Sequence, residues 1–544
     1  MPPTHEVLNQ ATPLVDYDVA ASPVLIESLH REGGGWAEDE LHELGRIAGS
    51  AQAQEWGRVV ENVPPVLHTH DRYGHRIDEV EFHPYWHELM TVSTRFGMTG
   101  GPWRDPKPGA HVARSAKFIA WGPVDAGHMC PIVMTYAAIP ALRKSPELAA
   151  IYEPGLIAPE YEFGLRNPVE KRGLIAGMSM TEKQGGSDVR ANTTTATPNS
   201  DGTYTIVGHK WFTSAPMSDV FLTLAQTQNG LSCFLLPRVL PDGTRNNLRL
   251  QRLKDKLGNR SNASSEIEYD NAVGWLVGEE GRGVPTIIEM VNLTRLDCAV
   301  SGAASARIGL NQAIHHAKHR KAFGDLLINQ PLMRNVLADL AIDAEVNTML
   351  SLRLARAVDE SVAGDENEAL FRRLANAVAK YWMCKRAPSH AFEALECLGG
   401  NGYVEESGMP RLYREAPLNS IWEGSGNVAA LDSLRAMAKQ PESLGVLFAE
   451  LEAAEGRDRH YDEALRELRK EFSDLEDMQY RARRVVERIA LLLQGSLVLQ
   501  HGNPAVAEAF CVTRLGHDWG HAYGTLPRGL DIDTIINRAT PEDV

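Results

Sequence analysis

Residues Arg411–Val428 read RLYREAPLNSIWEGSGNV and hold a carboxylate in an informative setting. Glu423 lies between an Ile-Trp pair and a flexible Gly-Ser-Gly run. A carboxylate beside an indole is partly removed from water, which raises its pKa and suits it to accept a proton near neutral pH. The stretch therefore predicts a general base at Glu423. From these residues alone, the alternative is a surface carboxylate where a loop enters a helix, stabilised by the positive end of that helix.

Length and composition describe a globular chain of several domains. The 544 residues exceed what one hydrophobic core supports and predict two to four domains. The net charge of -16 disfavours a general polyanion binder, so any nucleic-acid role needs a local basic patch. Six scattered cysteines without a CxxC pair indicate neither a disulfide framework nor a zinc ribbon. With no signal-peptide pattern and no apolar run of membrane-spanning length, we expect a cytoplasmic protein without a membrane partner.

The hydrophobic pattern outside this stretch predicts an α+β fold in four regions. Helical patterns alternate with loops at first, and short β-branched runs separated by turn residues follow. Long helical patterns then return, and their short connections favour an antiparallel bundle. The expected regions are an N-terminal helical domain (1–172), a central β-domain (173–280), a helical bundle (281–438) and an extra C-terminal helical region (439–544).

Individual helices are expected in the last two regions. The bundle predicts helices over 284–323, 331–362 and 368–398. The C-terminal region predicts two helices between Leu444 and Leu499. No repeat of fixed period accompanies these patterns, so a solenoid is not indicated.

Three stretches have residues suited to a polar cofactor. The loop Met180–Asp188, MTEKQGGSD, offers hydroxyls and bare backbone amides, although a plain turn explains it equally well. On an expected strand, Trp211 and Thr213 alternate onto one face, where a core tryptophan is the alternative. The segments RKAFG and GGNGY each follow a long helix. A cation or a glycine backbone at such a place suits a pyrophosphate. The alternative is that the glycines only cap the helix.

Histidines are numerous but do not predict a metal site. Imidazoles and carboxylates gather between 68 and 87, yet their spacings fit no compact ligand set. Two HxxxH pairs, at 315–319 and 517–521, lack the adjacent Glu of a metallohydrolase. We expect no bound metal.

Together and in this order, the pieces resemble the acyl-CoA dehydrogenase superfamily of flavoproteins. The matching motifs, over roughly residues 120–437, are MTEKQGGSDV, GHKWFTS, KLGNRSNASSEIEYDNA, GEEGRG, RKAFG, LGGNGY, LYRE and IWEGSGN. The chain looks most similar to the AidB-type branch, flavoproteins of the bacterial response to DNA alkylation. The resemblance implies an N-terminal helical domain, a central β-barrel, a C-terminal four-helix bundle, non-covalent FAD and a homotetramer.

The resemblance also implies roles for single residues. Glu423 matches the catalytic base, while Arg295 and Trp422 match positions beside the substrate. Arg320 and Phe323 match an element that reaches the FAD of a neighbouring subunit. The implied FAD contacts are Met180, Thr181, Gly186, Ser187, Trp211, Phe212, Thr213, Arg320, Phe323, Gly399, Gly400, Gly402, Ser425 and Asn427.

Some residues depart from the family pattern. Lys183 and Gln184 place charge and bulk in the cofactor loop, and Trp422 stands where a Tyr is usual. Gln330 lies one residue short of its usual spacing, and Glu396 replaces a Gln before the diglycine. These differences disfavour an ordinary long-chain acyl-CoA substrate.

Two classes of function follow from the resemblance. The first is an FAD-dependent oxidoreductase, in which Glu423 removes the α-proton of an acyl-CoA or related small molecule and the β-hydrogen leaves as hydride to flavin N5. The second is a flavoprotein that binds duplex DNA and protects it from, or removes, alkylating agents, with weak dehydrogenase activity. A flavin-binding scaffold without turnover is the third possibility.

A basic helical face is the candidate DNA contact. Arg481, Arg484 and Arg488 share this face, and Arg435 is the next candidate. Acids outnumber bases in the surrounding region, so a solvated face or a subunit contact is the alternative.

Overall fold

The computed structural model describes residues 4–541, which form two compact units. The first, the helical unit, contains the N-terminal segment to Ala51, His111–Pro123 and the chain from Arg295 onward. The second, the barrel unit, contains Gln52–Ala110 and Val124–Thr294. The hydrophobic pattern predicted four consecutive regions, whereas each compact unit is assembled from separate segments of the chain.

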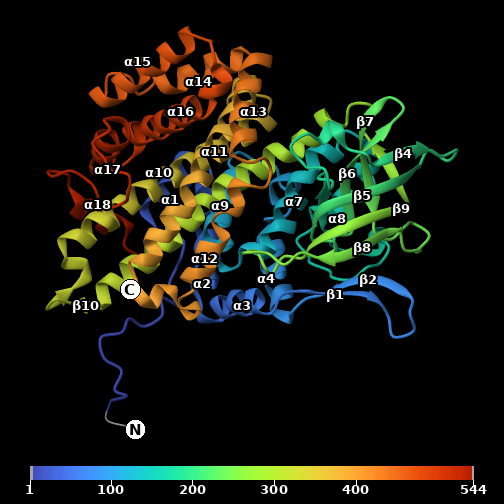
Figure 1. Cartoon of the computed structure of the whole chain (residues 1–544), viewed down its shortest axis with the longest axis horizontal. Coiled ribbons are helices and arrows are strands. Elements are labelled where there is room, and N and C mark those ends of the chain that lie inside the picture. The colour runs from blue at the N-terminus through green and yellow to red at the C-terminus, as the bar shows by residue number, and fades with distance from the viewer. Residues whose placement is uncertain (1–3, 542–544) are drawn as a thin grey trace. The chain divides into compact units, whose positions relative to one another are not determined.

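The barrel unit is built around a closed sheet (Figure 1). β6 pairs with β4 on one side and β7 on the other, so that β4, β5, β9, β7 and β6 form a ring, with β3 beside β6 and β8 beside β9. The strands are β3 (Ala176–Ser179), β4 (Thr195–Pro198), β5 (Tyr204–Ser214), β6 (Val220–Thr227), β7 (Gly230–Pro237), β8 (Leu248–Leu253) and β9 (Ser264–Val277).

Sequence explains why β6 and β7 are central. Most of their residues are β-branched or apolar and most are buried on both faces, with Phe221 opposite Leu236 in the antiparallel register. Five helices accompany the barrel: α3 (Ala51–Asn62), α4 (Pro84–Arg95), α5 (Gly101–Arg104), α7 (Ala126–Leu142) and α8 (Pro146–Leu156).

A small hairpin in this unit was not expected from the sequence. β1 (Val66–His70) and β2 (Arg76–Glu81) pair antiparallel, within a region for which helices and loops were predicted. The segment is rich in polar residues, and only Asp78 and Val80 of β2 are buried, so the alternation of a half-buried strand is weak.

The helical unit contains three long helices whose apolar faces are buried (Figure 1). α10 and α11 pack together, and α13, α14 and α16 pack on α11. The helices are α1 (Pro23–Arg31), α2 (Glu38–Gly49), α6 (Ala110–Trp121), α9 (Gly283–His319, which begins in the barrel unit), α10 (Pro331–Val362), α11 (Glu366–Glu396), α12 (Met409–Glu415), α13 (Gly426–Lys439), α14 (Glu442–Glu452), α15 (Arg459–Ser473), α16 (Met478–His501), α17 (Pro504–Phe510) and α18 (Ile532–Ala539).

Two expected helix boundaries were wrong. α9 ends at His319 rather than Phe323 because the chain turns into the hairpin β10 (Lys321–Ala322) and β11 (Asp325–Leu326), with Phe323 in the left-handed region at φ 54°. Between Leu444 and Leu499, the three helices α14, α15 and α16 replace the expected two. α15 and α16 are separated at 474–477, where Asp477 has φ 50°.

Buried ion pairs hold distant segments of the helical unit together. Arg114 donates to both oxygens of Asp297 at 2.8 Å, with both side chains 1% exposed. Arg514 of the C-terminal region binds Asp339 and Asp343 of α10. Because such charges are costly to bury unpaired, these pairs fix which segments can lie side by side. No helix of the described residues is long and apolar enough to cross a membrane.

Candidate active site

Glu423 lies in a tight turn between a short 3-10 helix, Leu418–Ser420, and α13. The backbone N–H groups of Ile421 and Trp422 both donate to the Leu418 carbonyl, at 2.9 and 3.1 Å. Glu423 then adopts a left-handed backbone with φ 57°, and Gly424 follows at φ 106°. A non-glycine residue costs about 1 kcal/mol in this conformation, so the surrounding contacts must hold it there.

Two buried cations hold the turn by its main-chain carbonyls. Arg295 Nε of α9 donates to the Glu423 carbonyl at 2.9 Å, and Lys380 Nζ of α11 donates to the Gly424 carbonyl. Arg295 is 5% exposed and Lys380 1% exposed. The predicted role of Arg295 was a substrate contact. Its guanidinium contacts the turn and Asp432, and the substrate contact stays a prediction.

Asp432 balances the charge of Arg295. Its carboxylate accepts from Arg295 Nη1 at 2.6 Å and from Arg373 at 3.0 and 3.1 Å. Burial alone would raise the pKa of Asp432, but the two guanidinium groups more than offset this and hold it below its usual value. The carboxylate therefore stays ionised, and the position of Arg295 is fixed at both ends.

Trp422, the residue before Glu423, is held by a hydrogen bond from its side chain. Its indole N–H donates to Asn419 Oδ1 at 2.9 Å, and Asn419 Nδ2 donates to Ser301 Oγ of α9 at 2.9 Å. The indole predicted to lie beside the base thus has a defined orientation. Neither Asn419 nor Ser301 was recognised from the sequence, because they lie 118 residues apart along the chain.

Two thiols lie in the same environment as Glu423 and Lys380. Cys384 Sγ contacts the Cys298 carbonyl at 3.4 Å. Burial raises the pKa of Cys384 to about 12, and burial raises that of Cys298 well above its usual value, with the Glu423 carboxylate adding to this effect. Both thiols are therefore neutral at physiological pH and act as small apolar groups.

The loop Met180–Asp188 in the barrel unit is organised by Glu182 rather than by its hydroxyl residues. The buried Glu182 carboxylate accepts from Lys210 Nζ at 2.8 Å and from the backbone of Thr193 at 2.7 Å and Thr194 at 3.1 Å. Gln184, expected to add bulk beside the cofactor, instead donates to the same carboxylate at 2.9 Å. The loop is consequently fixed from inside the barrel.

The residues of this loop that were predicted to bind the cofactor are partly buried (Met180 and Thr181) or exposed (Gly186 and Ser187). The Thr181 carbonyl accepts from Trp211 N at 2.8 Å, which joins the loop to β5, and the Met180 carbonyl accepts from Asn192 at 3.0 Å. A Cβ on Gly186 would overlap the Thr181 side chain, so only glycine allows this approach. Ser187 is exposed at the loop surface.

The expected alternation of Trp211 and Thr213 was wrong. Lys210 pairs with Ile267 and Thr213 with Ser265, so β5 carries one extra residue between these pairs. Lys210 and Thr213 both point inward, whereas Trp211 is half-buried and Phe212 is 50% exposed. The Thr213 hydroxyl lies 2.5 Å from Ser179 Oγ, and Lys254 Nζ lies 3.7 Å from the centre of the Trp211 ring.

The predicted residues after α9 and α11 meet at the N-terminal segment. Arg320 donates to the Asn9 carbonyl at 2.5 Å, and Asn401 of the 3-10 helix Gly399–Tyr403 donates to Gln10 at 3.1 Å. Gly402 is buried, and a Cβ there would overlap the Leu395 carbonyl, whereas Gly399 and Gly400 have open space. Phe323 is 98% exposed and Tyr403 83% exposed.

Ser425 and Asn427 lie at the positive end of α13. Arg483 Nε of α16 donates to Asn427 Oδ1 at 2.8 Å. A Cβ at Gly426 would lie 2.8 Å from Lys385 Cε and 3.4 Å from Arg483 Nη2, so glycine allows both cations to approach this helix start. Two cations beside a helix N-terminus form a strongly positive point, and the sequence did not link either of them to α13.

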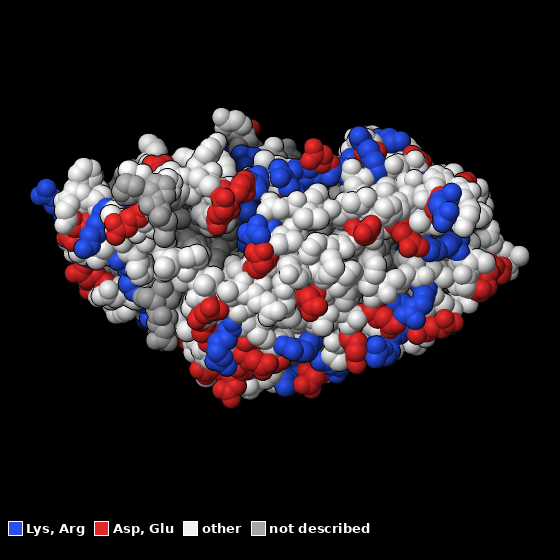
Figure 2. Space-filling model, turned by 90° about the horizontal axis from the view of Figure 1, so that it is seen from below, with Lys and Arg blue, Asp and Glu red and all other residues white. Residues whose placement is uncertain are grey.

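The predicted DNA-contacting arginines are paired with acids of α15. Arg481, Arg484 and Arg488 contact Glu471 at 2.6, 3.0 and 2.9 Å. Arg435 lies 3.5 Å from Asp432 and is 60% exposed. Because Glu471 pairs with all three arginines, the helical face is less positive than its sequence suggested. On a different face, seen from below in Figure 2, Lys and Arg side chains also lie among Asp and Glu side chains.

Histidines of the 68–87 segment pair with carboxylates of the same hairpin. His68 lies 2.8 Å from Glu81, and His75 lies 2.9 Å from Asp71. Within residues 4–541, no group of three or more His, Cys, Asp or Glu side chains is arranged to hold a metal ion.

Comparison with known proteins identifies the family of this architecture. Three family models match: the "Adaptive response protein AidB N-terminal domain" over residues 9–163, the "Acyl-CoA dehydrogenase, middle domain" over 177–272 and the "Acyl-CoA dehydrogenase, C-terminal domain" over 281–438. The chain is 46% identical over 515 residues to "Putative acyl-CoA dehydrogenase AidB" of Escherichia coli strain K12, covering 94% of each protein. The chain therefore belongs to the acyl-CoA dehydrogenase family of oxidoreductases. Within that family, it is of the AidB type.

Solved structures agree with this assignment. The structure of Caenorhabditis elegans ACDH-11 in complex with C11-CoA has a TM-score of 0.84 and 28% sequence identity, with 92% of this chain and 91% of that chain covered. An acyl-CoA dehydrogenase from Bacillus anthracis complexed with FAD has a TM-score of 0.64 at 18% identity, over 84% and 85% of the two chains. The expected architecture of N-terminal helical, central β-barrel and C-terminal helical domains is thus confirmed.

Proposed function

We propose that this chain catalyses the FAD-dependent α,β-dehydrogenation of an acyl thioester, with Glu423 as the general base. The observation that supports this most directly is the fixation of the Glu423 turn. Arg295 and Lys380 hold the carbonyls of two consecutive residues, which keeps Glu423 in a backbone conformation that it would otherwise leave. A base held in one geometry loses little entropy when it meets its substrate.

FAD suits the residues present, and the family to which the chain belongs uses it. The start of α13, with Ser425, Asn427, Lys385 and Arg483, supplies backbone N–H groups and positive charge suited to a diphosphate. Taken by itself, the barrel unit offers the partly exposed aromatic ring of Trp211, whose backbone N–H donates to the Thr181 carbonyl of the loop. When bound, FAD would accept the β-hydrogen as hydride, because no protein side chain accepts two electrons in this way.

The chain's own residues then have separate tasks. Glu423 would take the proton from the α-carbon of the thioester, and its carboxylate would become neutral as the proton arrives. Trp422, fixed through Asn419, would limit the width of the acyl site beside the base. This supports short or branched acyl groups over long straight ones, in keeping with a Trp where the family usually has Tyr.

Anaerobic titration with acyl-CoAs tests the proposal. FAD-loaded protein is mixed with short, branched and long acyl-CoAs, and the flavin absorbance near its visible maximum is followed. We expect bleaching with at least one short or branched acyl-CoA and less with long straight chains. Flavin that stays oxidised with every acyl-CoA, although the protein is fully loaded, would contradict the proposed reaction.

We further propose a homotetramer in which Arg320, Phe323 and the Gly399–Tyr403 segment contact a neighbouring subunit. The support is the exposure of Phe323 and Tyr403, since large apolar side chains left this open are typical of contact surfaces. Light scattering should give four times the chain mass, and Phe323→Asp should shift it toward smaller species. A monomeric parent protein with full FAD content would contradict this.

The geometry supports the enzymatic function better than a primary role in DNA binding. The pairing of three arginines with Glu471 removes part of the positive charge that phosphate contacts need. If α16 nonetheless binds duplex DNA, alanine substitution of Arg481, Arg484 and Arg488 should reduce the salt dependence of binding. An unchanged salt dependence would place any DNA contact elsewhere, with Arg435 as the next position to substitute.

A further inference from the structure

Arg307 of α9 is a buried cation outside the proposed active site. It is 6% exposed, and within residues 4–541 no carboxylate lies within ion-pair distance of it. Its Nη2 donates to the Val19 carbonyl at 3.1 Å, whereas its Nη1 is buried without a hydrogen-bond partner. Buried charges are normally paired, because the protein interior replaces water poorly as a solvent for ions.

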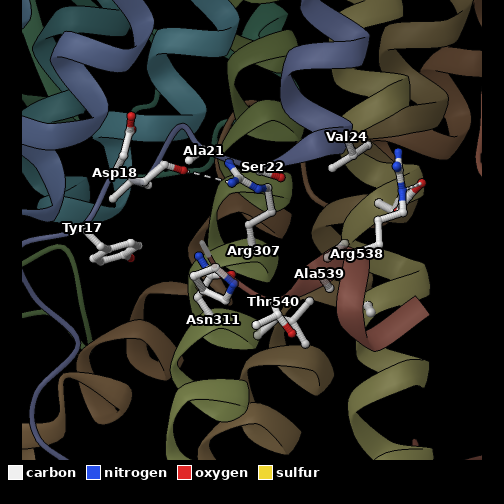
Figure 3. A pocket seen from close by; sticks show the side chains of 16 residues that line it. Tyr17, Asp18, Ala21, Ser22, Val24, Arg307, Asn311, Arg538, Ala539 and Thr540 are labelled. Carbon is white, nitrogen blue, oxygen red and sulfur yellow. Dashed lines mark hydrogen bonds and ion pairs between the residues drawn. The ribbon is translucent and has the colours of Figure 1, made fainter. Parts of the chain in front are cut away.

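A small cavity of about 30 Å³ lies beside this guanidinium (Figure 3). Its walls come from the N-terminal segment 17–24, from α9 and α10, and from the end of α18. Figure 3 shows Tyr17, Arg307, Asn311 and Thr540 arranged around it. The Tyr17 hydroxyl is also buried without a hydrogen-bond partner, although it faces Asn311, so two unsatisfied polar groups share one cavity.

The two carboxylates that line the cavity are committed to other cations. Asp18 lies 2.7 Å from His42 Nδ1 and 3.6 Å from Arg46. Glu345 lies 3.0 Å from Arg538, which also binds Glu27. Neither lies within ion-pair distance of Arg307. Burial lowers the pKa of Arg307 to about 10, partly opposed by Tyr17 and by Asp18 from beyond ion-pair distance, which leaves the guanidinium charged at neutral pH.

We propose that this cavity binds a small monovalent anion of about the size of chloride, held by Arg307 Nη1. A volume of about 30 Å³ accommodates one such ion and suits it better than the larger phosphate. The Tyr17 hydroxyl and the Asn311 amide supply further donors. Water alone would satisfy the hydrogen bonds but would bring no negative charge to Arg307, and Asp18, which acts on Arg307 from beyond ion-pair distance, is already paired with His42 and Arg46.

The anion has a structural consequence. It lies where the N-terminal segment, α9 and the last helix α18 meet, so its binding stabilises all three against separation. An ion that binds only the folded chain raises its stability in proportion to the logarithm of its concentration. The C-terminal region is thereby joined to the N-terminal segment by an ion as well as by the Arg538–Glu27 pair.

Bromide is a direct probe, because it replaces chloride and scatters anomalously. Crystals of the FAD-loaded protein grown in sodium bromide should show an anomalous peak in the cavity, within hydrogen-bonding distance of Arg307 Nη1. Density for water there, with no anomalous signal at saturating bromide, would overturn the proposal.

Thermal unfolding gives an independent measurement in solution. At constant ionic strength, replacing gluconate, which is too large for the cavity, with bromide should raise the melting temperature by about 1 to 3 °C. Arg307→Gln should abolish this increase, whereas Arg172→Gln, at an 80% exposed position of the barrel unit, should retain it. An increase that persists in Arg307→Gln would contradict the site.

If that variant does not fold, Tyr17→Phe provides a second test. This substitution removes one donor and should lower the bromide occupancy in crystals. An unchanged occupancy would count against the assigned geometry.

Discussion

Glu182 and Glu423 each lie close to a buried lysine, yet the lysine contacts a different part of the residue in each case. In the barrel unit, Lys210 and the backbone of Thr193 donate to the Glu182 carboxylate itself. In the helical unit, Lys380 and Arg295 donate to main-chain carbonyls of the Glu423 turn. The first arrangement uses the carboxylate as an anchor. The second holds the backbone of the turn that carries the proposed base.

The largest expected effect comes from removing the ion pair between Glu182 and Lys210. Glu182→Gln leaves Lys210 buried without its counter-ion and should lower the stability of the barrel unit by about 3 kcal/mol. Thermal unfolding and FAD content measure this, since the Met180–Asp188 loop depends on the same carboxylate. Glu268→Gln, which removes an exposed partner of Lys183, is the matched control and should change little. Equal stability of Glu182→Gln and the parent would show that the pair is not an anchor.

Removing the proposed base should have the next largest effect, on rate rather than on stability. Glu423→Gln keeps the size and the held carbonyl but cannot accept the α-proton. We expect acyl-CoA-driven bleaching to slow by on the order of a hundredfold or more, which corresponds to about 2.7 kcal/mol. The melting temperature and FAD content should match those of the parent. Bleaching at the parental rate would remove Glu423 from the mechanism.

Lys380→Met should give a smaller effect that distinguishes positioning from simple packing. Without the ammonium, the Gly424 carbonyl loses its donor, and we expect kcat to fall about tenfold with little change in KM. Because a buried positive charge near the base is also lost, the acid limb of the pH–rate profile should move to higher pH. Lys380→Arg should restore part of the rate. A melting temperature that falls while kcat and the pH profile stay unchanged would limit Lys380 to a structural role.

The smallest expected effect is the pH dependence of the stability that Glu182 contributes. Burial would raise the pKa of Glu182, but hydrogen bonds from Gln184, Lys210, Thr193 and Thr194 hold it well below its ordinary value of 4.5. A depressed folded-state pKa contributes stability above pH 4.5 that is lost as the pH falls below it. The difference in melting temperature between the parent and Glu182→Gln should therefore be full at pH 7 and begin to shrink below pH 4.5. A difference that grows on acidification would contradict this sign.

Local patterns predicted most of the fold. The observed α10 has the same bounds as the expected helix 331–362, because apolar residues recur there at helical spacing between a starting proline and a loop. The motifs also drew attention to the Glu423 turn and to the Met180–Asp188 loop, whose role in binding FAD stays a prediction. The bulge in β5 escaped prediction, since an extra residue between Lys210 and Thr213 is visible only in the pairing with β9.

Contacts between distant residues account for the rest of what was missed. Arg295 lies 128 residues from Glu423, and Lys380 lies 44 residues from Gly424, so no local pattern links them. One signal was present for Lys380: a lysine stands in the otherwise apolar stretch of α11, where burial requires a partner. The segment 9–10, which joins Arg320 to Asn401, carried no such signal.

The hydrogen bond from Arg483 to Asn427 links the extra C-terminal region to the turn that carries Glu423. Binding of a ligand to that region can therefore be coupled to binding of substrate. α16 contacts the first turn of α13 at Asn427, four residues after Glu423. A ligand of α16 that binds more tightly when this turn has one arrangement than when it has another changes the affinity of the protein for substrate. Reciprocity then requires substrate to change the affinity of that ligand by the same factor. Such coupling is measurable as a substrate-dependent Kd for the α16 ligand, and Arg483→Ala should reduce the factor to one.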